Sequence, residues 1–200
     1  MMDVPEIDHQ PDFIAIPEVF QSFATGKPFE HCICCETYLL ADGTQYVIEK
    51  GIIQYPETQV KDVAFEYAMC LPCAEKMRQA LSKDSLARME AYFQEKVDFA
   101  ARRDNQRLSG NRNVHDWLQH CLVSQTPMAE AREYQLFALC DGPDMVFGDA
   151  PYMLAGVVMA ELQELLSPET KEVLDDFIDQ YFGLPPAWKE LIKDRNLFLI

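Results

Sequence analysis

The chain has 200 residues, hydrophobic residues make up 48% of it, and its formal net charge is −16. This composition is typical of a globular protein that buries a substantial core. Nucleic acid and anionic membranes repel so acidic a chain, so we expect neither as a partner. No run of about 18 apolar residues is present, so the sequence predicts no membrane-spanning helix.

The N-terminal segment, residues 1–28, carries four prolines among apolar residues. This pattern predicts an extended segment that packs onto the body of the protein, with a short helix at 18–23. The first thirty residues lack the basic start and the apolar stretch of a secretory signal, so we expect a cytoplasmic location. Seven cysteines in a reducing compartment indicate metal binding rather than disulfides.

Residues 29–82 are predicted to form a zinc-binding unit. Cys32 and Cys35 make one Cys-x-x-Cys pair, and Cys70 and Cys73 make a second pair after 34 intervening residues. Structural zinc sites use four soft ligands in a tetrahedron, and two such pairs complete that set. We therefore predict one structural Zn²⁺ per chain, bound by these four thiolates.

Two neighbouring residues leave the ligand set open. Cys34 can replace Cys32 or Cys35, and His31 has ligand spacing to Cys34. We prefer Cys32 and Cys35 because Leu39 then lies four residues beyond the second ligand, where a metal-binding turn commonly packs an apolar residue.

Secondary-structure signals around the cysteines predict a turn at 41–44, strands at 45–53 and 63–69, and a helix at 70–81 with Pro72 in its first turn. In this order, and in both cysteine pairs, the segment resembles treble-clef zinc fingers. The resemblance implies a fold and no activity. The whole chain is also similar to uncharacterised bacterial proteins with a Cys-x-x-Cys, a strand like 46–50 and a segment like 65–73, which again implies no activity.

Residues 83–126 are predicted to be a helical connector. Apolar residues recur at spacings of three and four from Leu86 to Ala100, which indicates one helix that begins at Ser82 or Asp84 and fades near residue 109. Ion pairs are expected between residues 84 and 88 and between residues 98 and 102. A second, short helix is predicted at 114–121.

Residues 127–200 are predicted to form an acidic C-terminal α+β unit. Strands are expected at 134–140 and 145–147 around a turn, followed by a helix that Asp149 caps with Pro151 at its first position. Ser167 is expected to cap a further helix that ends at Gly183, before a short helix at 188–193 and an apolar end at 197–200. No internal repeat is recognisable.

The predicted fold class is therefore α+β, with an N-terminal zinc-bound unit that resembles a treble clef, central helices, and a C-terminal hairpin followed by helices. Four thiolates would close the metal site, and no histidine lies between residues 36 and 70, so we expect no catalysis there. Cys121 and Cys140 are predicted to be small buried hydrophobic residues.

Residues 113–200 carry 15 acidic and 5 basic residues, a net charge of −10. We expect a non-enzymatic, zinc-stabilised protein whose acidic surface binds a protein partner, for which a basic partner would be suitable. Two enzymatic alternatives stay open. One is a thiol-disulfide oxidoreductase using Cys70 and Cys73, and the other is a hydrolase using C-terminal acidic residues. Asp141, Asp144 and Asp149 could surround a divalent cation, but the pattern favours a turn at 141–144 and a helix cap at Asp149.

Overall fold

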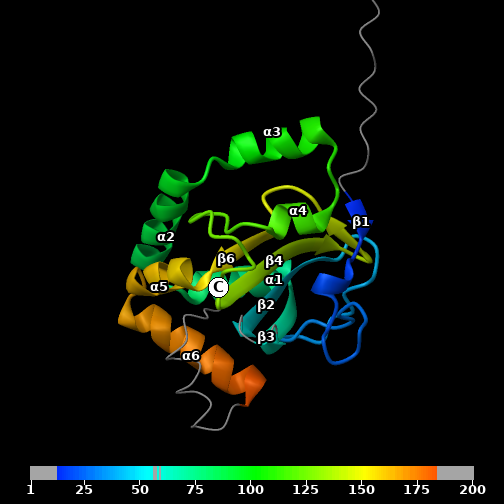
Figure 1. Cartoon of the computed structure of the whole chain (residues 1–200). Coiled ribbons are helices and arrows are strands. Elements are labelled where there is room, and N and C mark those ends of the chain that lie inside the picture. Colours follow the sequence, from blue (N-terminus) through cyan, green and yellow to red (C-terminus); the bar gives the residue numbers. More distant parts are fainter. Residues whose placement is uncertain (1–12, 56–57, 59, 184–200) are drawn as a thin grey trace, which may run out of the picture.

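The structure, a computed structural model, describes residues 13–55, 58 and 60–183. It confirms the predicted α+β class, with a six-stranded antiparallel sheet bordered by helices (Figure 1). Among the described residues, no helix combines the length and the apolar character needed to cross a bilayer. The strands are β1 (Phe13–Ala15), β2 (Gln45–Tyr55), β3 (Val60–Cys70), β4 (Glu133–Asp141), β5 (Asp144–Val146) and β6 (Tyr152–Ala155). The helices are the 3₁₀ turn η1 (Glu18–Phe20), α1 (Leu71–Ala80), α2 (Lys83–Lys96), α3 (Phe99–Ser109), α4 (Val114–Leu118), α5 (Gly156–Glu164) and α6 (Pro168–Phe182).

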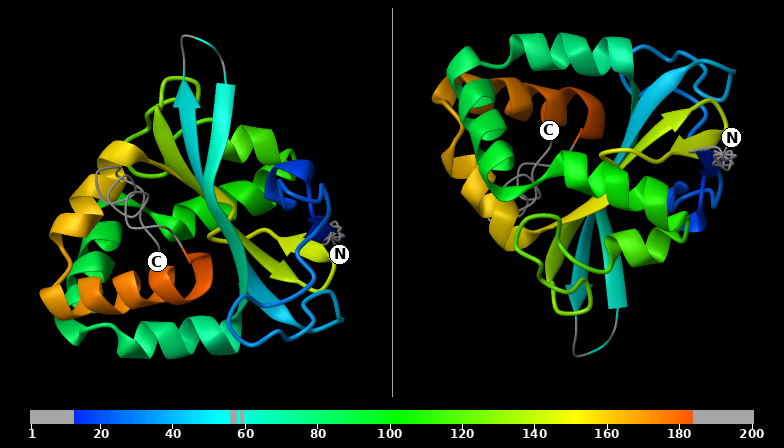
Figure 2. Two further views of the ribbon diagram at one scale, coloured as in Figure 1. Left: turned by 90° about the horizontal axis from the view of Figure 1, so that it is seen from below. Right: turned by 90° about the horizontal axis from the view of Figure 1, so that it is seen from above.

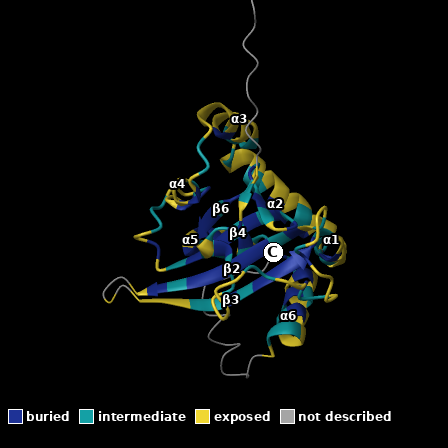
Figure 3. Cartoon of the chain, turned by 90° about the vertical axis from the view of Figure 1, so that its right-hand side faces the viewer, coloured by how far each residue is buried: buried dark blue, intermediate teal, exposed yellow. Residues whose placement is uncertain are grey.

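Strand β2 lies between β3 and β4 in the sheet, whose order is β1-β5-β4-β2-β3, with β6 also paired to β4. On one edge β2 pairs with β3 and on the other with β4. Most of its residues are buried, which fits its run of β-branched and aromatic residues (Figure 3). The segment predicted to bind zinc and the predicted C-terminal unit therefore contribute neighbouring strands to one sheet.

Helix α6 packs against the hairpin β2–β3 through aromatic side chains. The ring of Tyr67 on β3 lies 5.7 Å from that of Phe177 and 6.1 Å from that of Phe182 (centroid distances). Phe65 lies 6.2 Å from Phe182 on the same strand–helix interface. Edge-to-face aromatic pairs at these distances add to the stabilisation from burial. In both views of Figure 2 the C-terminal end of α6, coloured red, is the part of the helix that lies nearest to the hairpin.

The starts of α2 and α6 share a cluster of hydroxyl groups. Ser82 caps α2 by accepting from the Ser85 amide, and Ser167 caps α6 by accepting from the Thr170 amide. The Ser167 hydroxyl donates to that of Ser82 over 2.9 Å, and the Ser82 amide donates to the Thr170 hydroxyl over 3.0 Å. The predicted Ser167 cap is confirmed, and each cap is hydrogen-bonded to the other.

The helix predicted to run without interruption to residue 109 is instead two helices. Val97 adopts an extended conformation, and Asp98 caps α3 by accepting from the Ala101 amide. The expected pair between Asp98 and Arg102 is therefore wrong, because Arg102 instead donates to the Asp149 and Pro151 carbonyl groups. The predicted pair between Asp84 and Arg88 is confirmed.

The prediction of a helix that starts at Asp149 is also wrong. Residues 152–155 form β6, and α5 begins only at Gly156. Four apolar residues suit either structure, and pairing with β4 decides in favour of the strand. The predicted helices at 18–23 and 114–121 are shorter in the structure, at 18–20 and 114–118. The features predicted at 188–193 and 197–200 lie outside the described residues.

A buried ion pair connects the N-terminal segment to the hairpin. The Lys50 ammonium lies 3.0 Å from the Glu66 carboxylate, with side-chain exposures of 5% and 15%. Lys50 also donates to the Gln21 carbonyl, and Glu66 accepts from the Ser22 hydroxyl and the Phe23 amide. These contacts satisfy both charges, as a buried pair requires.

We predict that Glu66→Gln destabilises the protein by about 3 kcal/mol at neutral pH, because it leaves a buried ammonium without its counter-charge. Burial raises the pKa of Glu66, but the Phe23 amide and Lys50 lower it more, so the folded-state pKa lies below its usual value. The stabilisation is therefore present above the unfolded-state pKa and is lost as pH falls through the folded-state pKa.

Urea unfolding of both proteins across acidic and neutral pH tests this prediction, and the difference between them should shrink in acid. Asp104→Asn is the control, because its pair with Arg107 is exposed and should contribute little at any pH. A difference between wild type and Glu66→Gln that stays constant with pH would contradict the assignment.

Candidate metal centre

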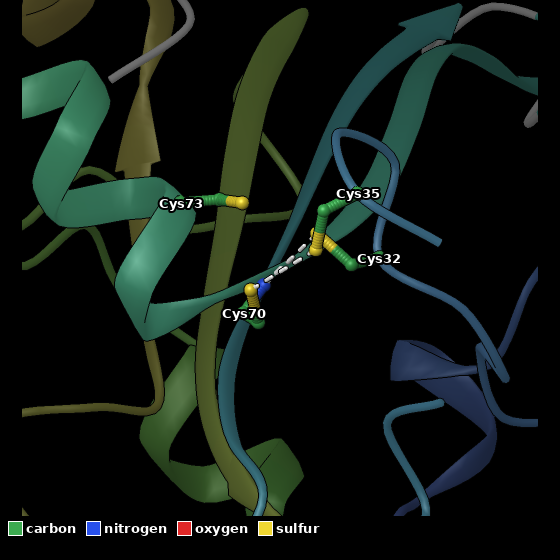
Figure 4. A group of neighbouring side chains, drawn as sticks. All are labelled: Cys32, Cys35, Cys70 and Cys73. Carbon is green, nitrogen blue, oxygen red and sulfur yellow. Dashed lines mark hydrogen bonds between the residues drawn. The ribbon is translucent and has the colours of Figure 1, made fainter. Parts of the chain in front are cut away.

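The structure brings the four predicted cysteines together. The Sγ atoms of Cys32, Cys35, Cys70 and Cys73 all lie within 4.8 Å of one another, and those of Cys35 and Cys70 are 3.7 Å apart. A tetrahedron with metal–sulfur bonds of about 2.3 Å has edges of about 3.8 Å. Figure 4 shows Cys73 reaching from the helix toward the cysteines of the loop and the strand end. The thiols are thus spaced for one tetrahedral ion.

A tight turn holds the first cysteine pair. The Cys32 amide donates to the Thr37 carbonyl over 3.0 Å, and the Glu36 amide donates to the Cys32 carbonyl over 3.0 Å. Glu36 adopts a positive φ of 60°, which closes the turn. The Ile33 amide donates to the Ala68 carbonyl, so the turn is attached to β3. This attachment brings the first pair close to the end of the strand that carries the second pair.

The second pair lies where β3 passes directly into α1. Cys70 is the last residue of the strand and the N-cap of the helix, and Cys73 lies in the first helical turn after Pro72. This confirms the predicted helix with its early proline. The Cys70 amide donates to the Cys32 Sγ over 3.4 Å, which joins the two pairs. Free N–H groups and the positive end of the helix dipole favour thiolates at a helix start, but in the metal-free chain burial outweighs this effect and raises the pKa of both thiols.

Burial separates the four thiols into two kinds. Cys32, Cys70 and Cys73 are buried, and Cys35 is exposed. Burial raises the pKa of both Cys70 and Cys73, whereas hydrogen bonds from Thr37 lower that of Cys35 to about 6. A bound metal ion would replace the protons of the buried thiols, because only thiolates act as ligands.

The two residues that left the ligand set open lie outside the cluster. His31 is exposed, and its ring packs edge-on against Tyr38 at 5.7 Å. Cys34 is partly buried, which raises its pKa, and its thiol has the Tyr181 side chain as a hydrogen-bond partner. Leu39 is fully buried, as the choice of Cys32 and Cys35 expected. The role of the four cysteines as ligands stays a prediction.

Other candidate residues are not gathered into a comparable group. In the part of the chain that the structure describes, the four cysteines are the one group of three or more His, Cys, Asp or Glu placed to hold a metal ion. Asp149 instead pairs with Arg103, and Asp141 and Asp144 lie opposite each other at the hairpin β4–β5. Cys121 and Cys140 are fully buried, as predicted.

A surface pocket adjoins the cysteine cluster. The described residues that line it include Cys35, Cys70, Cys73 and Glu75, and none of those described is a histidine. Glu75 accepts hydrogen bonds from Arg78 and from the amide of Gln79 on the same helix. The Glu75 carboxylate is therefore already hydrogen-bonded on its own helix.

No protein-family model, curated protein or solved structure matches this chain.

We predict that Cys35 is the first of the four cysteines to react with iodoacetamide in the metal-free chain, because it is exposed and its pKa is lowered to about 6. The rate should reach half its maximum near that pH, and Thr37→Val should move the midpoint upward by removing the side-chain hydrogen bond. Peptide mass spectrometry after timed alkylation measures both. Thr126→Val, in a different turn, is the control, and a midpoint near the usual thiol value of about 8.5 would contradict the prediction.

Proposed function

We propose that Cys32, Cys35, Cys70 and Cys73 bind one zinc ion in a closed structural site, and that the chain is a non-enzymatic protein whose acidic surface binds a protein partner. The observation that carries the first part is the convergence of four thiols, from a turn and a helix start, to within 4.8 Å. The order of turn, hairpin and helix supports a treble-clef-like unit around the ion.

The donor set favours zinc over other common ions. Four thiolates are soft ligands in a tetrahedral arrangement, which suits zinc and excludes calcium and magnesium, since those ions prefer oxygen. Four protein ligands leave no open position for substrate or water. Since none of the described residues that line the adjoining pocket is a histidine, the site suits a structural role better than a catalytic one.

The oxidoreductase alternative is less well supported. Such an enzyme needs an accessible thiol with a low pKa as its nucleophile. In the second pair, burial raises the pKa of both Cys70 and Cys73, and both side chains are buried. The one accessible thiol with a lowered pKa, Cys35, belongs to the other pair.

The acidic surface is concentrated on the last helices of the described chain. Helix α6 carries five acidic residues and one lysine, and α5 adds two further acidic residues. Glu169, Glu172, Asp176 and Asp179 are exposed on α6. A surface with this charge attracts basic proteins and accelerates their association at low salt.

We predict that the purified protein contains one zinc ion per chain, and that Cys73→Ser abolishes or strongly reduces the metal content by removing a buried ligand. Chelation of the ion should destabilise the fold by several kcal/mol, since structural zinc contributes roughly 10 kcal/mol or more in small domains. Elemental analysis and thermal unfolding with and without chelator provide the two measurements.

Cys34→Ser is the matched control, because Cys34 is adjacent to a proposed ligand and lies outside the cluster. It should retain the metal and nearly all of the stability. Metal-free protein with a reversible disulfide between Cys70 and Cys73 would overturn the zinc proposal and favour the oxidoreductase.

The partner half of the proposal has its own prediction. Glu169→Gln, Glu172→Gln and Asp176→Asn together should weaken capture of a protein partner from host extract several-fold at low salt, because they remove three exposed negative charges. Quantitative mass spectrometry of captured proteins at about 50 and about 500 mM salt measures the effect. Neutralising Glu30, Asp62 and Glu130, which are exposed elsewhere, is the charge-matched control. Partner binding that changes neither with salt nor in either triple variant would contradict the proposal.

A further inference from the structure

Residues 120–164 repeat the backbone of residues 31–80. We name residues 31–80 the first unit and residues 120–164 the second unit. Each consists of a turn that follows a His-Cys dipeptide, an antiparallel strand pair and a helix that starts directly where the second strand ends. In the first unit the strands and helix are β2, β3 and α1. In the second unit they are β4, β6 and α5, with β5 between the two strands.

The turns of the two units make the same hydrogen bonds. In the first, the Cys32 amide donates to the Thr37 carbonyl over 3.0 Å, and in the second, the Cys121 amide donates to the Thr126 carbonyl over 2.8 Å. Other equivalent features are positive φ at Glu36 (60°) and Gln125 (58°), bridges His31–Tyr38 and His120–Pro127, and side-chain contacts Cys35–Thr37 (3.1 Å) and Ser124–Thr126 (2.8 Å). The two turns therefore share all four features.

Each turn is attached to its second strand in the same way. The Ile33 amide donates to the Ala68 carbonyl over 3.0 Å, and the Leu122 amide donates to the Met153 carbonyl over 2.8 Å. In both units the acceptor lies two residues before the end of the strand. The turn therefore has the same position relative to the helix start in each unit.

The sulfur of each His-Cys cysteine accepts a hydrogen bond from the amide at the helix start. The Cys70 amide donates to Cys32 Sγ over 3.4 Å, and the Ala155 amide donates to Cys121 Sγ over 3.3 Å. Cys70 and Ala155 are the N-caps of α1 and α5. In the sheet, Cys70 lies opposite Tyr46 of β2, and Ala155 lies opposite Tyr134 of β4. The strand partner of each cap is thus a tyrosine.

An approximate two-fold axis relates the units within the sheet. Strands β2 and β4 are antiparallel neighbours, with Tyr46 opposite Cys140 and Ile52 opposite Tyr134. Tyr134 lies 88 residues after Tyr46, and Cys140 lies 88 residues after Ile52. Exchanging each residue for its equivalent therefore turns the pair Tyr46–Cys140 into the pair Tyr134–Ile52, which is also present. The pair Glu49–Phe137, also 88 residues apart, marks the axis.

We infer that the second unit is a copy of the first in which three of the four metal ligands have been replaced, so that it folds without an ion. The equivalents of the four proposed ligands, in order, are Cys121, Ser124, Ala155 and Val158. This inference rests on the proposed metal site for its prediction of stoichiometry, whereas the structural equivalence stands on the contacts above. Ala155 and Val158 are 2% and 1% exposed, so apolar packing occupies the positions of the second ligand pair.

Cys121 retains a structural task in this copy. Its side chain is fully buried, and its Sγ accepts from the Ala155 amide and also from the Ser124 amide at 3.5 Å. An unpaired amide at the start of a buried helix would be costly, and the sulfur provides its acceptor. The residue equivalent to Cys32 is therefore still a cysteine although its three co-ligands are not.

The decisive experiment restores the missing ligands in the full chain. Ser124→Cys, Ala155→Cys and Val158→Cys together complete a four-thiolate set with Cys121. Cobalt(II) titration, followed by the thiolate charge-transfer and d–d bands, and elemental analysis should give one ion for wild type and two for this variant. Glu130→Cys, Val157→Cys and Glu164→Cys together add three exposed thiols to the same unit outside the four positions and should leave the content at one ion.

The outcomes separate the two proposals. One ion in wild type and one in the restored variant overturns the inference of a repeat and leaves the proposed zinc site intact. No ion in wild type and one in the restored variant overturns the proposed zinc site and supports the repeat. If circular dichroism shows that the restored variant does not fold, Ser124→Cys with Val158→Cys gives a three-thiolate site, and the absence of a second, weaker cobalt-binding event in it overturns the inference.

Discussion

The antiparallel pairing of β2 with β4 is the interaction on which the rest of the structure depends. It joins residues 45–53 to residues 133–141 along nine consecutive pairs, across a sequence separation that no local signal bridges. Strand β3 pairs with the other edge of β2, and β6 pairs with β4. Strand β3 leads directly into α1, and β6 leads directly into α5. Both cysteine turns are therefore positioned by one pair of strands.

The two units show two solutions to the same physical problem. Each must hold a turn, a strand end and a helix start together at one point. The first unit brings four thiols to that point, where a bound ion would replace their protons and hold them as thiolates. The second unit keeps one sulfur as a hydrogen-bond acceptor and fills the remaining space with alanine and valine. Dispersion contacts and apolar burial stabilise that point in the second unit, as coordination bonds to the proposed ion would in the first.

The sequence predicted well what depends on short-range chemistry. Two Cys-x-x-Cys pairs, the strand from Gln45 and the helix that contains Pro72 all have local signals, and the structure contains each feature. The break at Val97–Asp98 was missed because apolar periodicity continues across it, and the cap contact at Asp98 is worth only about 1 kcal/mol. Strand β6 was missed because its conformation is decided by β4, a distant partner.

The repeat was missed for a related reason. Its sequence signal is a short pattern that occurs at 31–37 and again at 120–126. The pattern is His-Cys followed by an aliphatic residue, with a Thr four positions after that residue. Loss of three cysteines removed the pattern that makes the first unit recognisable, whereas the backbone hydrogen bonds were kept. Every residue has a backbone carbonyl group, and every residue except proline has a backbone N–H group. Backbone hydrogen bonds therefore place few constraints on which side chains occur, and the sequence does not reveal them.

The shared hydroxyl cluster at the starts of α2 and α6 has a consequence for how the chain folds. The Ser82 amide donates to the Thr170 hydroxyl, 88 residues away, and the Ser167 amide donates to the Ser85 hydroxyl, so each helix supplies an acceptor for the start of the other. Neither helix can reach its full local stability while it is an isolated segment, because part of its cap arrives only when the chain has closed. Helix formation here is thus tied to a long-range contact, which favours slow folding with few populated intermediates and makes opening of either helix end a property of the whole domain.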